Sequence, residues 1–211
     1  LGEIAGALTH WALPEEERHH LCVTMHHGHF QGAAKRKGDH ALCARCLARG
    51  DSHEETVVHT VHECPESREV WSALARAWEA TTGEPLDTSN PTLTVLGLRP
   101  RPDSSAPAQA RERFEAREPA WRLLHAVTLL TLHRARNRVH AAHHDPKGSR
   151  EARRTKPKDM LRAIRLRVAQ RVQYEHSKAT YAARCEPRAA PRQRAWHRFH
   201  KHWLATGVAS L

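Results

Sequence analysis

Residues 43–65 read CARCLARGDSHEETVVHTVHECP and hold three of the five cysteines of this 211-residue chain, together with three histidines. Two residues separate Cys43 from Cys46, a spacing that lets a tight turn aim both sulfurs at one point. Twelve residues then precede His59, and four more precede Cys64. Because zinc prefers four thiolate and imidazole ligands in a tetrahedral set, the stretch predicts a zinc site formed by these four side chains.

Two further histidines of the stretch are alternative ligands. His62 could replace His59, and His53 is a less favourable candidate. Four protein ligands leave no open coordination position, so the predicted zinc is structural and not catalytic. The other interpretation is a set of reduced cysteines in a small core, which fits poorly with the three glutamates of the stretch.

A second group of possible ligands lies upstream of this stretch. Cys22 and His26 are four residues apart and would share one face of a helix, so a second metal site is an alternative use of these residues. The 19 histidines of the chain also fit a GC-rich coding sequence, which weakens this interpretation. The histidines concerned are His19, His20, His26, His27 and His29.

The cysteines form a poor disulfide framework. Their number is odd, Cys22 and Cys185 are distant singles, and we expect Cys185 to be a free thiol. This usage favours a reducing compartment, so we expect an intracellular protein, nuclear or cytoplasmic. No window has the run of about 18 apolar residues that a membrane span needs, and no signal peptide is recognisable. The chain begins at Leu1, which suggests a piece of a longer protein.

The positive charge is concentrated at one end of the chain. Residues 151–211 hold 15 Lys and Arg against 4 Asp and Glu, whereas residues 1–150 hold 19 of each. A one-signed segment on a neutral body is typical of a surface that binds polyanions, although a merely solvated helical tail is the alternative. The cations that we expect to contact RNA or DNA phosphates are Lys35, Arg36, Lys37, Arg45, Arg49, Arg162, Arg165, Arg167, Arg171, Arg192, Arg194, Arg198 and Lys201.

The hydropathy pattern predicts a mainly α fold, with a small zinc-knuckle module followed by a basic helical bundle and Pro/Ser-rich linkers. Helices are expected over residues 3–12, 15–30, 66–82, 119–144, 158–183 and after Pro191. The middle of 119–144 is apolar nearly all round and should form the centre of the bundle. In the last helix, Trp196, Phe199 and Trp203 recur at core spacing, with stacking on unpaired bases as the alternative.

The chain is expected to divide into three parts. Residues 1–84 would hold helices and the zinc-binding knuckle, 85–118 a Pro/Ser/Thr-rich linker, and 119–211 the basic helical region. Within the linker, TLTVLGL at 92–98 could be a short strand or an extended packed segment.

The metal-site stretch and the residues after it resemble a known family, the zinc-binding domain near the C-terminal end of LINE-type (non-LTR) retrotransposon reverse transcriptases. The family pattern is Cys-x2-Cys, then Glu-Thr-x2-His-x4-Cys-Pro, then Val-Trp. Downstream, the resemblance extends to an Arg-Asn pair at Arg136 and Asn137, where Leu132 or His133 stands in place of the family's Trp. The matching residues are Cys43, Cys46, Glu55, Thr56, His59, Cys64, Pro65, Val70 and Trp71.

The resemblance implies a structural zinc, RNA or DNA as partner, and a polymerase on another part of the same polyprotein. The polymerase itself is not in this chain, because no Phe/Tyr-x-Asp-Asp and no adjacent aspartates occur, and two-metal nucleotidyl transfer needs clustered carboxylates. No Gly-rich phosphate loop, Gly-x-Ser-x-Gly or His-Glu-x-x-His is found either, so we expect no enzyme activity. The alternative function is a zinc-stabilised helical scaffold for protein interactions, with a basic tail.

Overall fold

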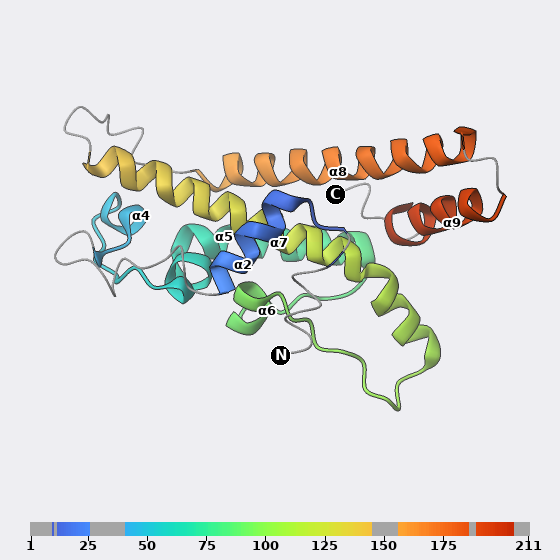
Figure 1. The fold of residues 1–211 in the computed structure, drawn as a ribbon. Coiled ribbons are helices and arrows are strands. Elements are labelled where there is room, and N and C mark those ends of the chain that lie inside the picture. Colours follow the sequence, from blue (N-terminus) through green and yellow to red (C-terminus); the bar gives the residue numbers. More distant parts are fainter. Residues whose placement is uncertain (1–9, 11, 26–40, 145–155, 186–188, 205–211) are drawn as a thin grey trace.

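The structure, a computed structural model, describes residues 10, 12–25, 41–144, 156–185 and 189–204, and these are helical with no β-sheet (Figure 1). The predicted mainly α fold is confirmed. Two π-helical turns, His59–Glu63 and His200–Leu204, interrupt the α-helices. The helices are α2 (Glu15–Met25), α4 (Ala44–Leu47), α5 (Pro65–Thr82), α6 (Pro91–Leu96), α7 (Ala108–His144), α8 (Pro157–Cys185) and α9 (Ala189–Phe199).

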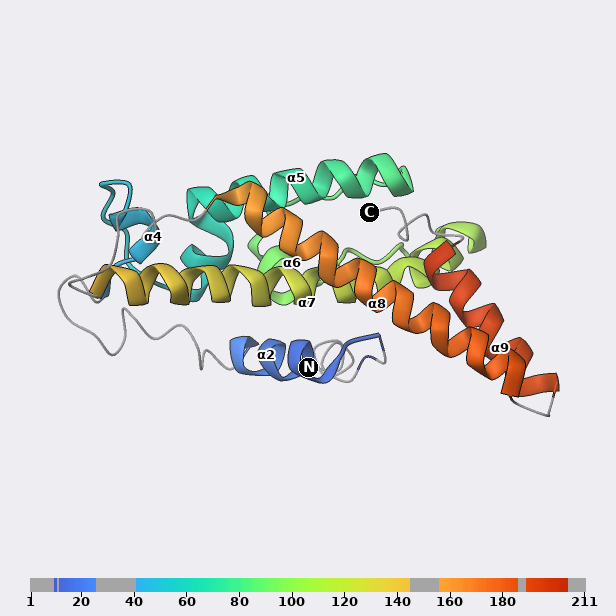
Figure 2. The same ribbon diagram turned by 90° about the horizontal axis from the view of Figure 1, so that it is seen from above.

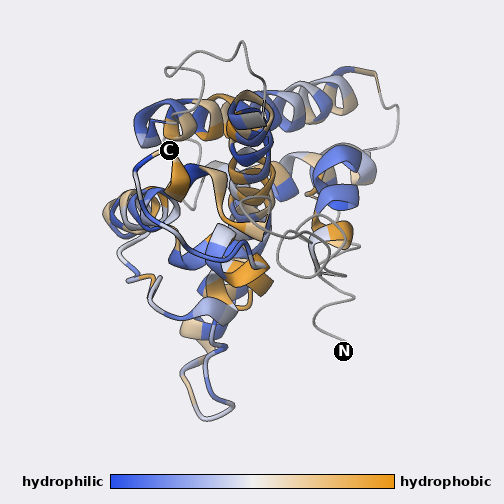
Figure 3. Cartoon of the chain, turned by 90° about the vertical axis from the view of Figure 1, so that its left-hand side faces the viewer, coloured by the Kyte–Doolittle hydropathy of each residue, from blue (hydrophilic) through white to orange (hydrophobic). Residues whose placement is uncertain are grey.

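Helix α7 is the central element. Seen from above, α5 and α2 flank it on opposite sides, and α8 crosses over it to reach α9 (Figure 2). Both colours of the hydropathy scale occur on the outer helices in Figure 3, as expected for helices that bury only one side. None of the helices among the described residues is long and apolar enough to cross a bilayer.

The core is built around α7, as its all-round apolar sequence predicted. Every residue from Pro119 to His133 is buried. Trp121 contacts Trp71 and Trp78 of α5, with ring centroids 6.5 and 5.9 Å apart. Its indole N–H donates to the carbonyl of Gly97 at 2.8 Å, so the buried polar group is satisfied. One hydrophobic cluster continues from Val57 beside the knuckle to Trp203 near the end of the described chain.

Residues 91–96 form helix α6, so the expectation of a strand or extended segment here was wrong. Asn90 caps the helix through a hydrogen bond from the Thr92 N–H to its side chain at 2.8 Å. Pro91 occupies the first turn, and Gly97, with φ 68°, ends the helix in the left-handed conformation. Asn90 before the helix, Pro91 as its first residue and Gly97 after its last are helix start and stop signals, and they outweighed the β-branched residues between them.

Helix α7 begins eleven residues before the predicted start and contains Pro119 in its interior. Its first turns, expected to be linker, are held by Arg117, which donates to the Thr82 carbonyl at 2.7 Å and pairs with Glu84. The tripartite division of the chain stays a prediction. The predicted helix over 3–12 falls almost entirely outside the described residues, as do residues 26–30 of the next one.

Candidate metal centre

A short turn positions Cys43 and Cys46. Leu42 and Glu54 form an isolated antiparallel bridge, and the Cys43 N–H donates to the His53 carbonyl at 2.8 Å. Cys43 is the N-cap of α4, and Cys46 lies inside this one-turn helix. Gly50, with φ 89°, lets the chain reverse after it. The bridge and the turn together hold the two sulfurs on the same side, as the two-residue spacing predicted.

A π-helical turn positions the other two ligands. Thr56 starts it, because its hydroxyl accepts a hydrogen bond from the His59 N–H at 2.9 Å. The Cys64 N–H then donates to the His59 carbonyl at 2.7 Å, which is a hydrogen bond between residues five apart. In this wider turn, residues five apart lie about one turn from each other. The four-residue spacing between His59 and Cys64 therefore brings both side chains to one point.

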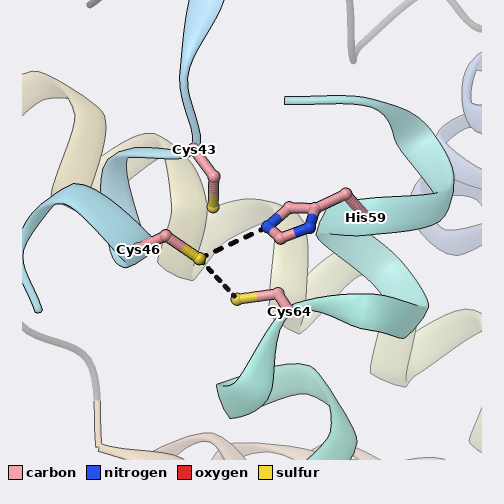
Figure 4. Close-up of side chains that lie close together, drawn as sticks. All are labelled: Cys43, Cys46, His59 and Cys64. Carbon is pink, nitrogen blue, oxygen red and sulfur yellow. Dashed lines mark hydrogen bonds between the residues drawn. The ribbon is translucent and has the colours of Figure 1, made fainter. Parts of the chain in front are cut away.

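The four predicted ligands meet in one buried cluster (Figure 4). Their ligand atoms all lie within 4.8 Å of one another; Cys46 Sγ is 3.3 Å from His59 Nε2 and 4.0 Å from Cys64 Sγ. With zinc bonds of about 2.3 Å to sulfur and about 2.0 Å to nitrogen, a tetrahedral site holds its ligand atoms roughly 3.5–3.8 Å apart. The buried Cys3His cluster therefore fits a zinc ion after small side-chain adjustments.

The cluster is unusual for three ordinary thiols. Mutual hydrogen bonds with Cys43 and Cys46 lower the pKa of the Cys64 thiol, and those from Cys43 and Cys64 raise the pKa of the Cys46 thiol. Three sulfurs this close cannot all ionise without a cation among them. A bound zinc ion would remove that conflict, because a thiolate that coordinates zinc loses its proton outright.

Arg45 supplies a positive charge behind the cluster. Its side chain is 0% exposed, and Nη2 donates to the Thr60 carbonyl at 2.5 Å and to Ser67 Oγ at 3.1 Å. Its charge also lowers the pKa of the Cys64 thiol. Zinc with three thiolates and a neutral imidazole has a net charge of −1, which a buried guanidinium would offset. The expectation that Arg45 contacts phosphates was wrong, because the side chain is directed inward.

The alternative histidines are not ligands in this arrangement. His62 Nδ1 lies 2.9 Å from Thr94 Oγ1, so His62 joins the knuckle to α6 instead. The exposed His53 stacks its ring on that of His59, with centroids 5.2 Å apart. A carboxylate oxygen of Glu63 lies 3.9 Å from His59 Nδ1, the nitrogen that faces away from the sulfurs. Such a carboxylate beside the second ring nitrogen is common around histidines that bind zinc.

A buried ion pair ties the metal cluster to the bundle. Arg136 of α7 donates from Nε to Glu55 Oε1 at 2.6 Å and from Nη2 to Glu55 Oε2, a bidentate pair between residues 81 apart in sequence. Glu55 also donates its N–H to the Ala41 carbonyl at 2.8 Å. On the other side, the Trp71 indole donates to the Val61 carbonyl at 2.8 Å. The sequence singled out Glu55, Trp71 and Arg136 but gave no signal of these partners.

The predicted nucleic-acid contacts are placed unevenly. Lys35, Arg36 and Lys37 lie outside the described residues, as does the side chain of Arg192 within α9. Arg167 pairs with Glu16 and Glu17, and Arg171 with Glu175, so these two arginines have internal partners. The remaining cations are exposed or half-buried on the surface: Arg49, Arg162, Arg165, Arg194, Arg198 and Lys201.

The aromatic stripe of the last helix is only partly buried. Phe199 and Trp203 lie in the core as predicted, but Trp196 is 47% exposed and stacks on Phe199 with the ring planes 14° apart. The Trp196 ring also lies 5.9 Å from that of His176 on α8, so it is packed on one side and open on the other, which periodicity alone does not reveal.

The histidine-rich segment around Cys22 shows no metal site among its described residues. His20 is buried and packs against His133, with ring centroids 4.8 Å apart. His26, His27 and His29 lie outside the described residues. Within the described part of the chain, only the Cys3His cluster brings three or more potential ligands together. No family model, curated protein or solved structure was found to match the chain.

Proposed function

We propose that this chain is a nucleic-acid-binding module with a structural zinc ion, from the C-terminal part of a non-LTR retrotransposon reverse transcriptase polyprotein, and that it is not catalytic by itself. The observation that carries the proposal is the closed Cys3His cluster, formed by the four residues that the family resemblance singles out. With three sulfurs and one imidazole as ligands, the metal keeps no position for a substrate.

Other residues of the family pattern support the same reading through their positions around the cluster. Thr56 caps the turn that holds His59, Trp71 donates to the turn from α5, and Glu55 pairs with Arg136. These contacts are the ones expected if the matching residues serve to build a structural zinc module.

A bound zinc ion would stabilise the folded conformation of residues 41–64. Residues 41–64 contain one short α-helix, one π-helical turn and a single β-bridge, which is little regular structure to hold four ligands in place. Zinc binding supplies folding free energy to such small segments. Trp71 and Glu55 then hold α5 and α7 against the metal-binding loop.

The nucleic-acid part of the proposal is supported by the surface of α8. Its exposed cations are Lys158, Arg162, Arg165, Lys178 and Arg184, whereas Asp159 is its one exposed acid and Glu175 is buried. A helix face of one sign attracts phosphates, and such binding weakens steeply with salt.

Zinc content and helicity test the metal part of the proposal. The purified chain should contain about one zinc, and Cys46→Ser and His59→Ala should lose it together with a small part of the helical signal in circular dichroism. Cys185→Ser removes an exposed cysteine outside the cluster and should keep the metal. A wild-type chain that holds no zinc, and is equally folded with chelator, would refute this part.

Salt-dependent binding tests the nucleic-acid part. Fluorescence anisotropy with a labelled oligonucleotide should show affinity that falls with salt, and Arg162→Gln with Arg165→Gln should reduce the log–log slope by about 1.4 for a single strand. Arg76→Gln, an exposed arginine on α5, is the matched control. Binding that is absent at low salt would contradict the proposal and favour the protein-interaction scaffold.

A further inference from the structure

The outer face of α8 carries an unbroken stripe of exposed side chains, which we call the α8 ridge. Its members follow one another at steps of four residues, and of three at the last step, so each lies beside the one before it and the row winds slowly around the exposed side of the helix. The side that packs on the core carries the buried Met160, Ile164, Val168 and Ala179. The α8 ridge consists of Arg162, Leu166, Gln170, Tyr174, Lys178 and Tyr181.

The ridge is the place where this protein exposes large hydrophobic side chains. Tyr174 is 56% exposed, Tyr181 70% and Leu166 59%, and among the described residues only Val58 and Trp196 are otherwise in this class. Single exposed hydrophobic residues are normal on a protein surface, but several in one row on a basic helix indicate a binding surface. The folding of the chain does not require these rings, because the core lies on the other side of the helix.

The ring of Tyr174 is held in place before any partner arrives. The Arg171 guanidinium lies 5.1 Å from the ring centroid, and Arg171 is itself paired with Glu175 at 2.6 Å. A ring fixed in this way loses little conformational freedom when a flat group stacks on it. Lys178 follows Tyr174 by four residues and precedes Tyr181 by three, so a cation lies between the two rings on the same stripe.

Rings and cations alternate here at the scale of a nucleic-acid strand. Tyr174 and Tyr181 are seven residues apart, which is about 10 Å along the helix axis. If the unpaired strand keeps the stacked spacing of a duplex strand, about 3.4 Å for each nucleotide, this distance spans roughly three nucleotides. The whole ridge, from Arg162 to Tyr181, is about 28 Å long and could follow on the order of eight nucleotides. A duplex hides the faces of its bases, so rings of this kind can stack only on an unpaired strand.

We infer that the α8 ridge binds single-stranded RNA or DNA, with Tyr174 and Tyr181 stacking on bases and Arg162 and Lys178 contacting phosphates. This inference rests on the proposed nucleic-acid function and adds that the preferred form is unpaired. The charge of the ridge is what selects a nucleic acid over an ordinary apolar protein segment as the occupant. Arg165 and Arg184 flank the stripe and extend the same positive charge.

The test compares one strand with its duplex. The full zinc-supplemented chain is titrated into a labelled oligonucleotide of about 16 nucleotides, either single-stranded or annealed to its complement. Tyr174→Leu and Tyr181→Leu should each weaken single-strand binding roughly 5- to 150-fold and change duplex binding less than about twofold. The salt slope should not change, because neither substitution removes a charge.

Tyr174→Phe and Tyr181→Phe are the matched controls, since they keep the ring and should keep the affinity within about threefold. Leucine variants that bind the single strand as tightly as the wild type, or that lose duplex binding in parallel, would overturn the ridge assignment while the proposed function stands. A chain that binds neither form at low salt would overturn both. Single-strand binding that is insensitive to salt would also overturn the ridge assignment, because phosphate contacts by Arg162 and Lys178 require a salt slope.

Discussion

Breaking the buried pair of Glu55 and Arg136 should cost several kcal/mol of stability, although its two residues lie 81 positions apart in the sequence. Both side chains are almost fully buried, and two charge-assisted hydrogen bonds join them. Removing one partner of such a pair leaves an uncompensated buried charge, which costs about 3–5 kcal/mol. We therefore expect Glu55→Gln and Arg136→Met each to lower the free energy of unfolding by about 3 kcal/mol or more.

The double variant separates the interaction energy between Glu55 and Arg136 from the energies of their other contacts. With both charges gone, Glu55→Gln combined with Arg136→Met should recover much of the loss, so the coupling energy should be about 2–3 kcal/mol. Urea unfolding of the zinc-supplemented protein, monitored by circular dichroism, measures the free energy of unfolding of the wild type, the two single variants and the double variant. Arg134→Gln is the matched control, because Arg134 lies two residues away and pairs with Glu16 in an exposed position. It should cost about 0.5 kcal/mol or less. Additive single variants, or an equal loss in the control, would refute the reasoning.

Three further predictions concern other buried groups. Gly97→Ala should destabilise the protein by about 3 kcal/mol in thermal or urea unfolding. The φ angle of Gly97 is 68°, and the new Cβ would lie 2.6 Å from His125 Nδ1. A loss of stability below about 1 kcal/mol would contradict this prediction. Burial lowers the pKa of His125 to about 3, so at this residue only the unfolded state takes up a proton as the pH falls below about 6.5. His125 should therefore contribute about 2 kcal/mol to the loss of stability between pH 7 and 5. In urea unfolding at both pH values, His125→Gln should make this loss smaller by about that amount, while His10, whose pKa burial also lowers, keeps its own share; an unchanged pH profile would contradict this. Arg45→Met should weaken zinc binding about 10- to 100-fold in competition with a chelator, because the metal centre loses its buried counter-charge. Equal zinc affinities of the variant and the wild type would show that the negative charge of the metal centre is balanced by other groups.

The sequence predicted the features whose signals are local. Cysteine and histidine spacing indicated the four ligands, and apolar periodicity indicated helices α5, α7 and α8 with their buried faces. The helix expected over residues 66–82 ends at Thr82, where Gly83 with φ 72° caps it in the left-handed conformation. Such features depend on the few residues around them, so they can be read without knowledge of the fold.

Features that depend on distant partners could not be predicted in this way. Arg45 lies between two predicted zinc ligands and was expected to contact phosphates, yet it donates hydrogen bonds to the Thr60 carbonyl and to Ser67 in the interior. The early start of α7 depends on Arg117, which finds its partners at Thr82 and Glu84 in an earlier part of the chain. In each case the acceptors of a long charged side chain belong to another segment of the chain, so the local sequence pattern does not reveal them.

The indole of Trp71 has consequences for how the protein can be divided into fragments. Its N–H satisfies a carbonyl of the metal-binding loop, while its ring packs against Trp121 and His125 in the middle of the bundle. A peptide that ended after α5 would keep all four ligands but would leave this ring, and the carboxylate of Glu55, facing water. The zinc knuckle therefore depends on the bundle for part of its structure, and a peptide that ends after α5 should bind zinc less tightly than the intact chain does. Swapping the knuckle between related proteins would succeed only if α7 were exchanged with it.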